Sequence, residues 1–111
     1  MKDGIRLPES VKIAWHSFTI RYPYIFRETS EIWGQCDHGT KEIRISNLDC
    51  GGQQRPASGI YVTLIHELLH AIDGVSGQNV FDEPKIVALS ELIYQVLTDN
   101  GWLKVDYPKT A

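Results

Sequence analysis

Residues 58–74 read SGIYVTLIHELLHAIDG, and this stretch carries the pattern that decides both the fold and the chemistry of the chain. His66 and His70 stand four residues apart, so on a helix their side chains leave the same face about one turn apart. Glu67 directly follows the first histidine. The run matches the HExxH pattern of zinc-dependent hydrolases, in which the histidines bind the metal and the glutamate is the general base.

The residues around this pattern predict a buried helix with recognisable ends. Ser58 is the expected N-cap, and Gly74 is the expected left-handed C-cap. Apolar residues cover most of the surface between them: Ile60, Leu64, Ile65, Leu68, Leu69, Ala71 and Ile72. Buried polar groups need partners, and one metal ion would satisfy His66, Glu67 and His70 together. The alternative is that the two histidines are ordinary core residues bonded to backbone carbonyls.

Length and composition are those of one globular domain. The 111 residues are 42% hydrophobic and 23% charged, which is enough apolar content for a single core. The net charge is −3 and no basic run is present, so binding of nucleic acid by a broad cationic face is not expected. No apolar run is long enough for a signal peptide or a membrane span. We therefore expect one domain over residues 1–111, located in the cytoplasm, with no nucleic-acid or membrane partner.

The only two cysteines, Cys36 and Cys50, show no CxxC spacing. Small secreted domains usually carry more cysteines than this. We interpret both as reduced thiols, with a single disulfide or a role as metal ligands as the alternatives.

The first half of the chain favours β-structure. Apolar residues alternate there in two opposite phases: Val11, Ile13 and Trp15, then Phe18, Ile20 and Tyr22. The change of phase near residues 16–17 predicts two short strands joined by a bulge or a tight turn. Residues 31–36 and 41–46 then flank the turn segment Asp37-His38-Gly39-Thr40 and predict a β-hairpin. Residues 47–57 form a polar loop before the histidine helix.

A second helix is expected to begin near Asp82-Glu83-Pro84 and to end near residues 100–101. Proline is favoured in a first helical turn, and acidic residues suit the positive end of the helix dipole. The expected buried stripe is Ile86, Leu89, Ile93, Val96 and Leu97. An apolar tail is expected to pack back on the core: Trp102, Leu103, Val105 and Tyr107.

A catalytic zinc site uses three protein ligands, so one more is needed beyond the two histidines. The metzincin pattern HExxHxxGxxH is not followed, because Ser76 stands where the third histidine would be. Asp73 lies seven residues after His66 and overshoots a metal held between the histidines, so we expect it to act indirectly or not at all. An acidic residue in a last helical turn is mildly unfavourable, which hints at a purpose.

Glu83 is the preferred third ligand, because the second helix must pack against the first and brings its acidic start near the metal. Asp82 is the alternative, since it shares a helical face with part of the buried stripe. Both could instead serve only as helix caps. Glu91 lies two turns further on and is less favoured as a ligand.

The chain resembles the small zincin-type metallopeptidases of phages and prophages, which are related in pattern to the ImmA/IrrE peptidases. The resemblance covers about residues 9–100, and its specific part is the HExxH run. Its weaker parts are Trp33-Gly34 and residues 42–45, 63–72 and 83–100. It implies an α+β fold with a small antiparallel sheet, a metal helix and a C-terminal helix that supplies a glutamate. The chain departs from ImmA/IrrE proteins in having no second, larger domain, so their regulatory role is not carried over.

The expected activity is hydrolysis of peptide bonds. Zinc held by His66, His70 and Glu83 would lower the pKa of its bound water, and Glu67 would take the proton as this water attacks a peptide carbonyl. An extended protein or peptide substrate could pair with the free edge of the hairpin. The alternatives are a zinc-stabilised binding module without turnover, and hydrolysis of another amide or an ester.

The oxyanion that develops during such a reaction needs a hydrogen-bond donor beyond the metal. The candidates are His38, Tyr94 and Tyr61. His38 lies in the predicted hairpin turn, where polar residues are common, so we expect it to be simply exposed to solvent rather than to act as the donor. His16, at the change of phase between the first strands, is expected to be structural or exposed.

Overall fold

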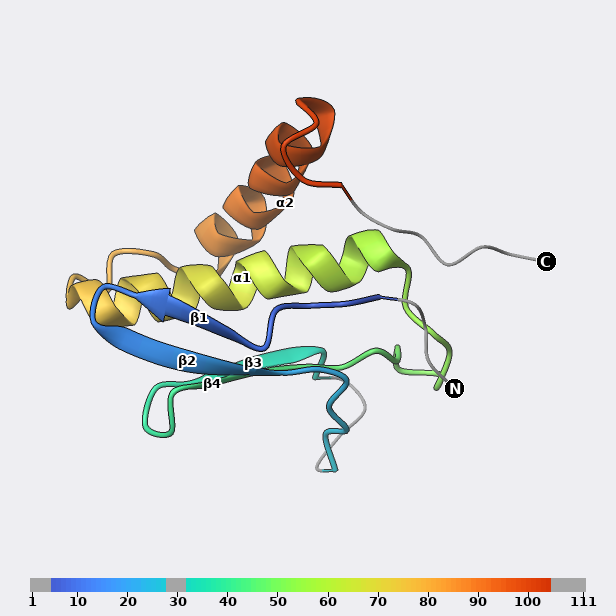
Figure 1. Ribbon diagram of the computed structural model, residues 1–111, viewed down its shortest axis with the longest axis horizontal. Coiled ribbons are helices and arrows are strands. Elements are labelled where there is room, and N and C mark those ends of the chain that lie inside the picture. The colour runs from blue at the N-terminus through green and yellow to red at the C-terminus, as the bar shows by residue number, and fades with distance from the viewer. Residues whose placement is uncertain (1–4, 28–31, 105–111) are drawn as a thin grey trace.

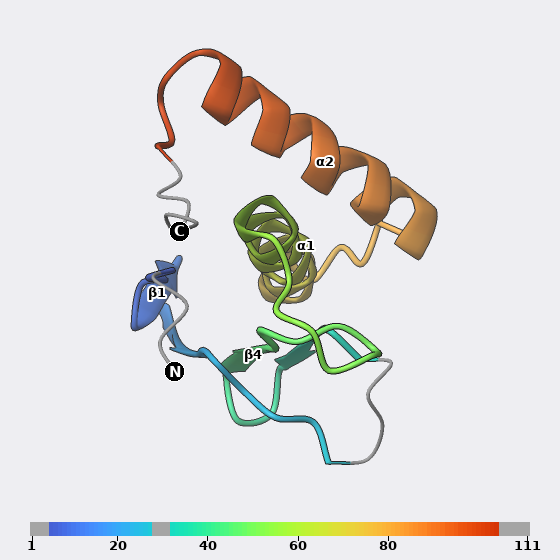
Figure 2. The same ribbon diagram turned by 90° about the vertical axis from the view of Figure 1, so that its right-hand side faces the viewer.

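The computed structural model describes residues 5–27 and 32–104. Its elements are β1 (Ser10–Ile13), β2 (His16–Arg21), β3 (Gly34–Asp37), β4 (Glu42–Ile45), α1 (Ala57–Ser76) and α2 (Glu83–Asp99). α1 lies along one face of the sheet (Figure 1). Viewed nearly along its axis, α1 forms a middle layer between the sheet and α2 (Figure 2). The α+β fold expected from the sequence is confirmed. Within the described ranges, no helix combines the length and the apolar character needed to cross a membrane.

The four strands form one mixed sheet in the order β1-β2-β4-β3. The β3–β4 hairpin is antiparallel, as predicted, and so is the β1–β2 pair. β2 and β4 run parallel, with Ile20 opposite Ile43, so the expectation of an antiparallel sheet was wrong. The alternation of apolar and polar residues has the same period in both kinds of pairing, and the long connection after β2 allows the parallel one.

A tight turn joins β1 to β2, which confirms the prediction from the change of phase. Ala14 adopts a φ of 54° in this turn, and Ile13 pairs directly with His16. Trp15 is 97% exposed, so the alternation that predicted it as an inward-facing strand residue ends at Ile13.

The core lies between the sheet and one face of α1. Its centre consists of Phe18, Ile20, Ile43, Ile45, Ile60, Leu64 and Ala71, all at most 7% exposed. Ile72 is 44% exposed, so α1 is not buried all round as its composition suggested. This leaves another face of the helix available to α2.

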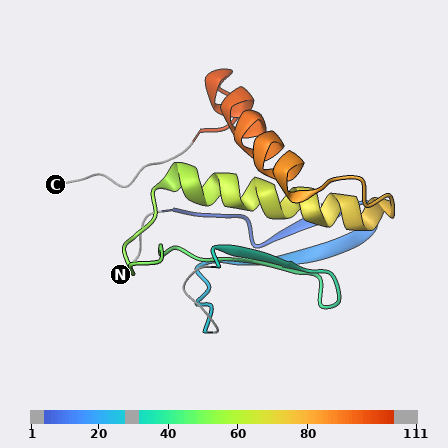
Figure 3. The ribbon, with the colours of Figure 1, turned by 180° about the vertical axis from the view of Figure 1, so that it is seen from behind.

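Both predicted caps of α1 were wrong. Its N-cap is Pro56, which has no side-chain cap bond, and Ser58 lies inside the first turn. The C-cap is Gly77, with a φ of 74°. Gly74 remains helical, and its missing side chain makes room for the ring of His38: a Cβ at Gly74 would lie 2.4 Å from that ring. The view from behind shows the β3–β4 turn and the end of α1 at the same end of the molecule (Figure 3).

α2 begins and ends where the sequence predicted. Asp82 is its N-cap and accepts a hydrogen bond from the backbone N–H of Lys85 at 3.0 Å. Ile86 is fully buried, but Val96 is 49% exposed and Trp102 is 74% exposed. α2 rises away from α1 towards its C-terminus, so its later turns lose their cover (Figure 1). The predicted stripe and tail are therefore wrong at these two positions, while Val105 and Tyr107 lie outside the described residues.

Candidate metal centre

Two histidines of α1 and one glutamate of α2 converge between the helices. The carboxylate of Glu83 spans both imidazoles: Oε1 lies 2.5 Å from Nε2 of His70, and Oε2 lies 3.4 Å from Nε2 of His66. The two ring centroids are 5.0 Å apart. One donor atom from each residue falls within 4.8 Å of the others, so the three can surround a single ion.

Asp73 explains how Glu83 reaches this position. Asp73 is 7% exposed, and its two carboxylate oxygens accept hydrogen bonds from the backbone N–H groups of Val80 and Phe81, at 2.9 and 3.2 Å. These bonds fix the loop between the helices just before the N-cap Asp82. Asp73 therefore acts as a positioning residue for the start of α2. The sequence offered one signal for this role, an acidic side chain at the unfavourable end of a helix.

Glu67 leaves α1 towards the sheet and is only 7% exposed. Burial, and to a smaller extent the nearby charge of Glu83, raise the pKa of Glu67 to about 7. A carboxyl with a pKa near 7 can both accept and release a proton at neutral pH, which is the property needed in a general base.

Gly34, the first residue of β3, allows Glu67 to lie against the sheet. A Cβ at this position would lie 2.6 Å from the methyl group of Thr63 and 2.9 Å from the Glu67 carboxylate. Only glycine permits this close approach of strand and helix. The sequence marked Gly34 only as a weaker part of the family resemblance and gave it no role in the site, because a lone glycine in a strand has many causes.

The other acidic candidates lie elsewhere. Asp82 serves as the helix cap, and its Oδ1 is engaged with the N–H of Lys85. Glu91 lies on α2 beside a groove, and it is not part of the group of metal-binding atoms.

The three candidate oxyanion donors differ in position. Tyr61 donates from its hydroxyl to the carbonyl of Arg6 at 3.2 Å and does not line the groove beside Glu67. Tyr94 lies on α2 about three turns after Glu83 and lines the groove. His38 packs on Gly74, one turn beyond His70. The remaining histidine, His16, begins β2 and is half-buried there.

Both cysteines are free thiols in the structure. Cys36 lies on β3, with its Sγ 3.9 Å from Nε2 of His38. Burial, followed by the charges of Glu67 and Asp37, raises the pKa of Cys36 to about 11, so this thiol stays protonated at neutral pH. Cys50 is exposed.

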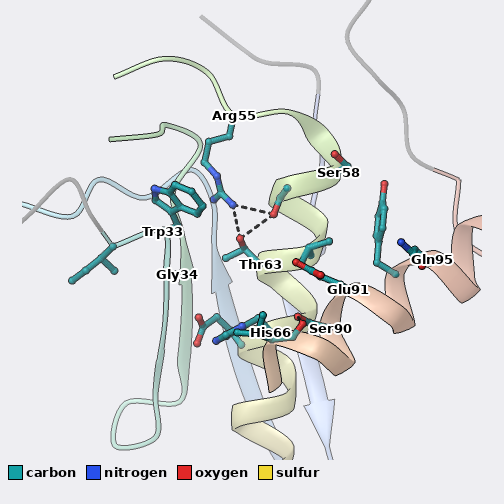
Figure 4. Close-up of a pocket in the computed structure, with 15 residues that line it drawn as sticks. Trp33, Gly34, Arg55, Ser58, Thr63, His66, Ser90, Glu91 and Gln95 are labelled. Carbon is teal, nitrogen blue, oxygen red and sulfur yellow. Dashed lines mark hydrogen bonds between the residues drawn. The ribbon is translucent and has the colours of Figure 1, made fainter. Parts of the chain in front are cut away.

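A groove of about 740 Å³ begins at His66 and Glu67 and runs towards the start of α1. Figure 4 shows α1 as its floor, Trp33 and Gly34 on one side, and Glu91 and Gln95 of α2 on the other. Among the described strands, β3 lies at the edge of the sheet, so this side of the groove presents backbone groups that no other described strand pairs.

The residues fit a metal with a preference for nitrogen and carboxylate ligands. Two imidazoles and one carboxylate are a common ligand set of catalytic zinc, which keeps one further position open. Glu67 is not needed to hold the ion, yet it is buried directly beside this ligand set. No protein family model, curated protein or solved structure matches the chain.

Proposed function

We propose that this protein is a zinc-dependent metallopeptidase of the zincin type. The observation that carries the proposal is the convergence of His66, His70 and Glu83, with the buried Glu67 next to them on the same helix. A structural zinc site would use four protein ligands and would have no need of an additional buried carboxyl. The HExxH run and the resemblance to small phage-type peptidases support the same function.

Each residue of the site would have a separate role in binding the metal or in transferring protons. His66, His70 and Glu83 would hold the ion, and Asp73 would keep Glu83 in place through the loop between the helices. Bound zinc supplies a Lewis acid that polarises a carbonyl and lowers the pKa of water. Glu67 would accept a proton from the attacking water and later deliver it to the leaving amine. Its raised pKa suits both steps near neutral pH.

The substrate would lie in the groove between β3 and α2. An extended peptide can add to the edge of the sheet through β3, which holds its backbone alongside Glu67. This geometry favours a peptide over a compact amide or ester. Because the cysteines are few and both are free, we place the enzyme in the cytoplasm.

A catalytically inert, zinc-stabilised binding module is the second candidate function. Such a module would use zinc only to stabilise its fold and would bind a partner in the groove without turnover. The position of Glu67 argues against it, since burying an ionisable carboxyl beside the ligands raises the free energy of the fold and serves no structural purpose there.

Two measurements test the proposal. Elemental analysis of the purified protein should find about one zinc per chain. His66→Ala should lose most of it, whereas His16→Ala, which removes a histidine remote from the cluster, should keep it. Retention of zinc by His66→Ala would contradict the proposed centre.

The second measurement separates the enzyme from the inert module. Glu67→Gln should retain the zinc while hydrolysis of casein or of a peptide library falls by at least ~10²-fold. Glu9→Gln, the same change at an exposed position, should leave the rate unchanged. Zinc-loaded wild-type protein that cleaves none of these peptides would favour the binding module.

A further inference from the structure

The groove beside Glu67 has a buried positive charge in its wall. Arg55 is 4% exposed and lies at the end of the groove away from His66 (Figure 4). Its side chain donates to three neutral acceptors: Nη1 to the carbonyl of Ser46 at 2.9 Å, and Nη2 to the carbonyl of Gly59 at 2.9 Å and to Oγ1 of Thr63 at 2.5 Å. The guanidinium also covers the ring of Trp33, with 4.8 Å between Cζ and the ring centroid.

A second arginine shows how unusual this environment is. Arg44, on the sheet, forms ion pairs with Glu42 at 2.9 Å and with Asp37 at 3.3 Å. Arg55 is more deeply buried, yet it takes part in none of the ion pairs among the described residues. Burial lowers the pKa of Arg55 below its usual range, and electrostatic interactions with Tyr22 and Asp49 offset only part of this effect.

A buried cation with only neutral partners has lost the solvation of water without gaining an opposite charge. An anionic group of a ligand would supply that charge. A guanidinium has five N–H donors, and the three bonds described above use three of them. The planar fork of arginine matches the two oxygens of a carboxylate.

The position of Arg55 sets the distance of such a carboxylate from the reacting bond. Thr63, which accepts from Arg55, lies one turn before Glu67, or about 6 Å along α1. Both Thr63 and Glu67 contact the same point of β3, at Gly34. An extended peptide advances by about 3.3 Å per residue. A carboxylate one or two residues from the cleaved bond therefore comes within reach of the guanidinium.

Two acidic residues line the same groove: Glu67, which belongs to the proposed catalytic group at one end of it, and Glu91 on α2. Glu91 is the one outside that group. It is exposed, and exposed charges are screened by water and salt, whereas a buried charge is screened much less. The buried positive charge of Arg55 therefore outweighs the exposed negative charge of Glu91, and the groove favours a negatively charged group of the ligand.

We propose that Arg55 makes this groove a subsite for a carboxylate of the peptide substrate, one or two residues from the cleaved bond. The carboxylate comes either from an acidic side chain or from the free C-terminus of the peptide. This inference rests on the proposed peptidase function.

The test compares two mixtures of random octapeptides, one with amidated and one with free C-termini, digested by the zinc-loaded wild-type protein and read by mass spectrometry. If side chains are the source, Asp or Glu within two residues of the cut will be preferred at least ~10-fold over Asn or Gln in both mixtures. If the chain terminus is the source, cleavage one or two residues from the end will be at least ~10-fold faster with the free terminus. Equal cleavage of acidic, amide and amidated peptides overturns the inference.

Arg55→Met should reduce the preference for carboxylate-bearing over neutral peptides from at least ~10-fold to less than about twofold. Arg21→Met removes the same charge from an exposed position on β2 and should preserve the preference. Because Arg55 also holds the carbonyls of Ser46 and Gly59, its replacement can prevent folding. The comparison of acidic and amide peptides on the wild-type protein then decides the question by itself.

Failure of the peptidase function is distinguishable from failure of the subsite. If no peptide is cleaved, the side-chain Nε–H resonance of Arg55 is followed by NMR during titration with acetyl-Ala-Glu-Ala-amide and with its Gln counterpart. Saturable shifts that need at least ~10-fold less of the Glu peptide support the subsite without catalysis. The same comparison is made between acetyl-Ala-Gln-Ala with a free C-terminus and its amide. The absence of a difference in both comparisons at millimolar peptide overturns the subsite.

Discussion

The two halves of α2 are held to the rest of the molecule in different ways. The first turns carry the N-cap Asp82, the carboxylate of Glu83 between two histidines, and the fully buried Ile86. The later turns expose large apolar side chains, with Leu92 at 58% and Val96 at 49%. One helix therefore has a fixed end at the group formed by His66, His70 and Glu83, and an open end along the groove.

This difference separates two requirements of the proposed enzyme. Metal ligands must be held at fixed positions, because a small displacement lowers both affinity and rate. A substrate groove must remain accessible, and the divergence of α2 from α1 keeps it so. The fixed end should therefore be sensitive to substitution, while the open end should tolerate it.

The largest expected effect is on zinc affinity at the fixed end. Glu83→Ala removes the carboxylate that faces both imidazoles and should weaken zinc binding by more than ~10²-fold, the upper range for losing a residue that only supports a ligand. Asp82→Ala should lower the free energy of unfolding by ~1 kcal/mol through the lost cap and leave zinc affinity within a few-fold. Competition with a chelator of known affinity measures both. The reverse ranking of the two variants would assign the ligand to Asp82.

A second effect concerns Glu67 in protein stripped of metal. Its pKa of about 7, against an ordinary value of 4.5, means that the folded state favours the protonated carboxyl. The associated stability is therefore fully present below about pH 4.5 and is lost as the pH rises through 7, by roughly 3 kcal/mol at most. Glu67→Gln cannot ionise, so at pH 8 it should be more stable than wild type by about 1–3 kcal/mol.

Urea denaturation at pH 5 and pH 8, in the presence of a chelator, measures this difference. Glu91→Gln is the control at the open end, where an exposed carboxylate should leave the pH dependence of wild type unchanged. If Glu67→Gln and wild type lose stability equally between the two pH values, Glu67 is not held in a desolvated position.

The sequence was sufficient for those parts of the fold that depend on local patterns. Alternation and turn residues predicted the β3–β4 hairpin, and the Asp-Glu-Pro start predicted the beginning of α2. The parallel pairing of β2 with β4 was missed, because it depends on where a long connection leads rather than on any residue pattern. Gly74 was wrongly predicted to end the helix. A glycine is needed there because the ring of His38, from a distant turn, occupies the space of a side chain.

The site was predictable to a similar degree. His66, Glu67 and His70 share one short pattern, and the proximity of Glu83 follows from packing α2 on α1. Gly34 and Arg55 could not be identified, since their importance lies in contacts with residues of other elements. Asp73 gave a weak signal through its place in the helix, but its backbone partners Val80 and Phe81 were invisible in the sequence.

Asp73→Asn tests whether the fixed end depends on this one anchor. The amide keeps the size of the side chain but can accept only one of the two loop N–H groups, and its NH2 group then faces the other. The free energy of unfolding should fall by about 1–2 kcal/mol, and zinc affinity should fall by about tenfold because Glu83 is less well positioned. Asp99→Asn, at the exposed end of α2, is the matched control and should change neither quantity. Unaltered zinc affinity in a destabilised Asp73→Asn would show that the histidines alone position Glu83.

The smallest expected effect lies at the open end of α2. Leu92→Gln replaces an exposed apolar side chain with a polar one of similar length and comparable helix propensity, so the free energy of unfolding should change by less than ~0.5 kcal/mol. Zinc content should also stay at the wild-type level, because the substitution lies about two and a half turns from Glu83. Urea denaturation and elemental analysis of the same preparation measure both quantities. A loss above ~1 kcal/mol would mean that this half of α2 is covered in solution, and the contrast between a fixed and an open end would then have to be abandoned.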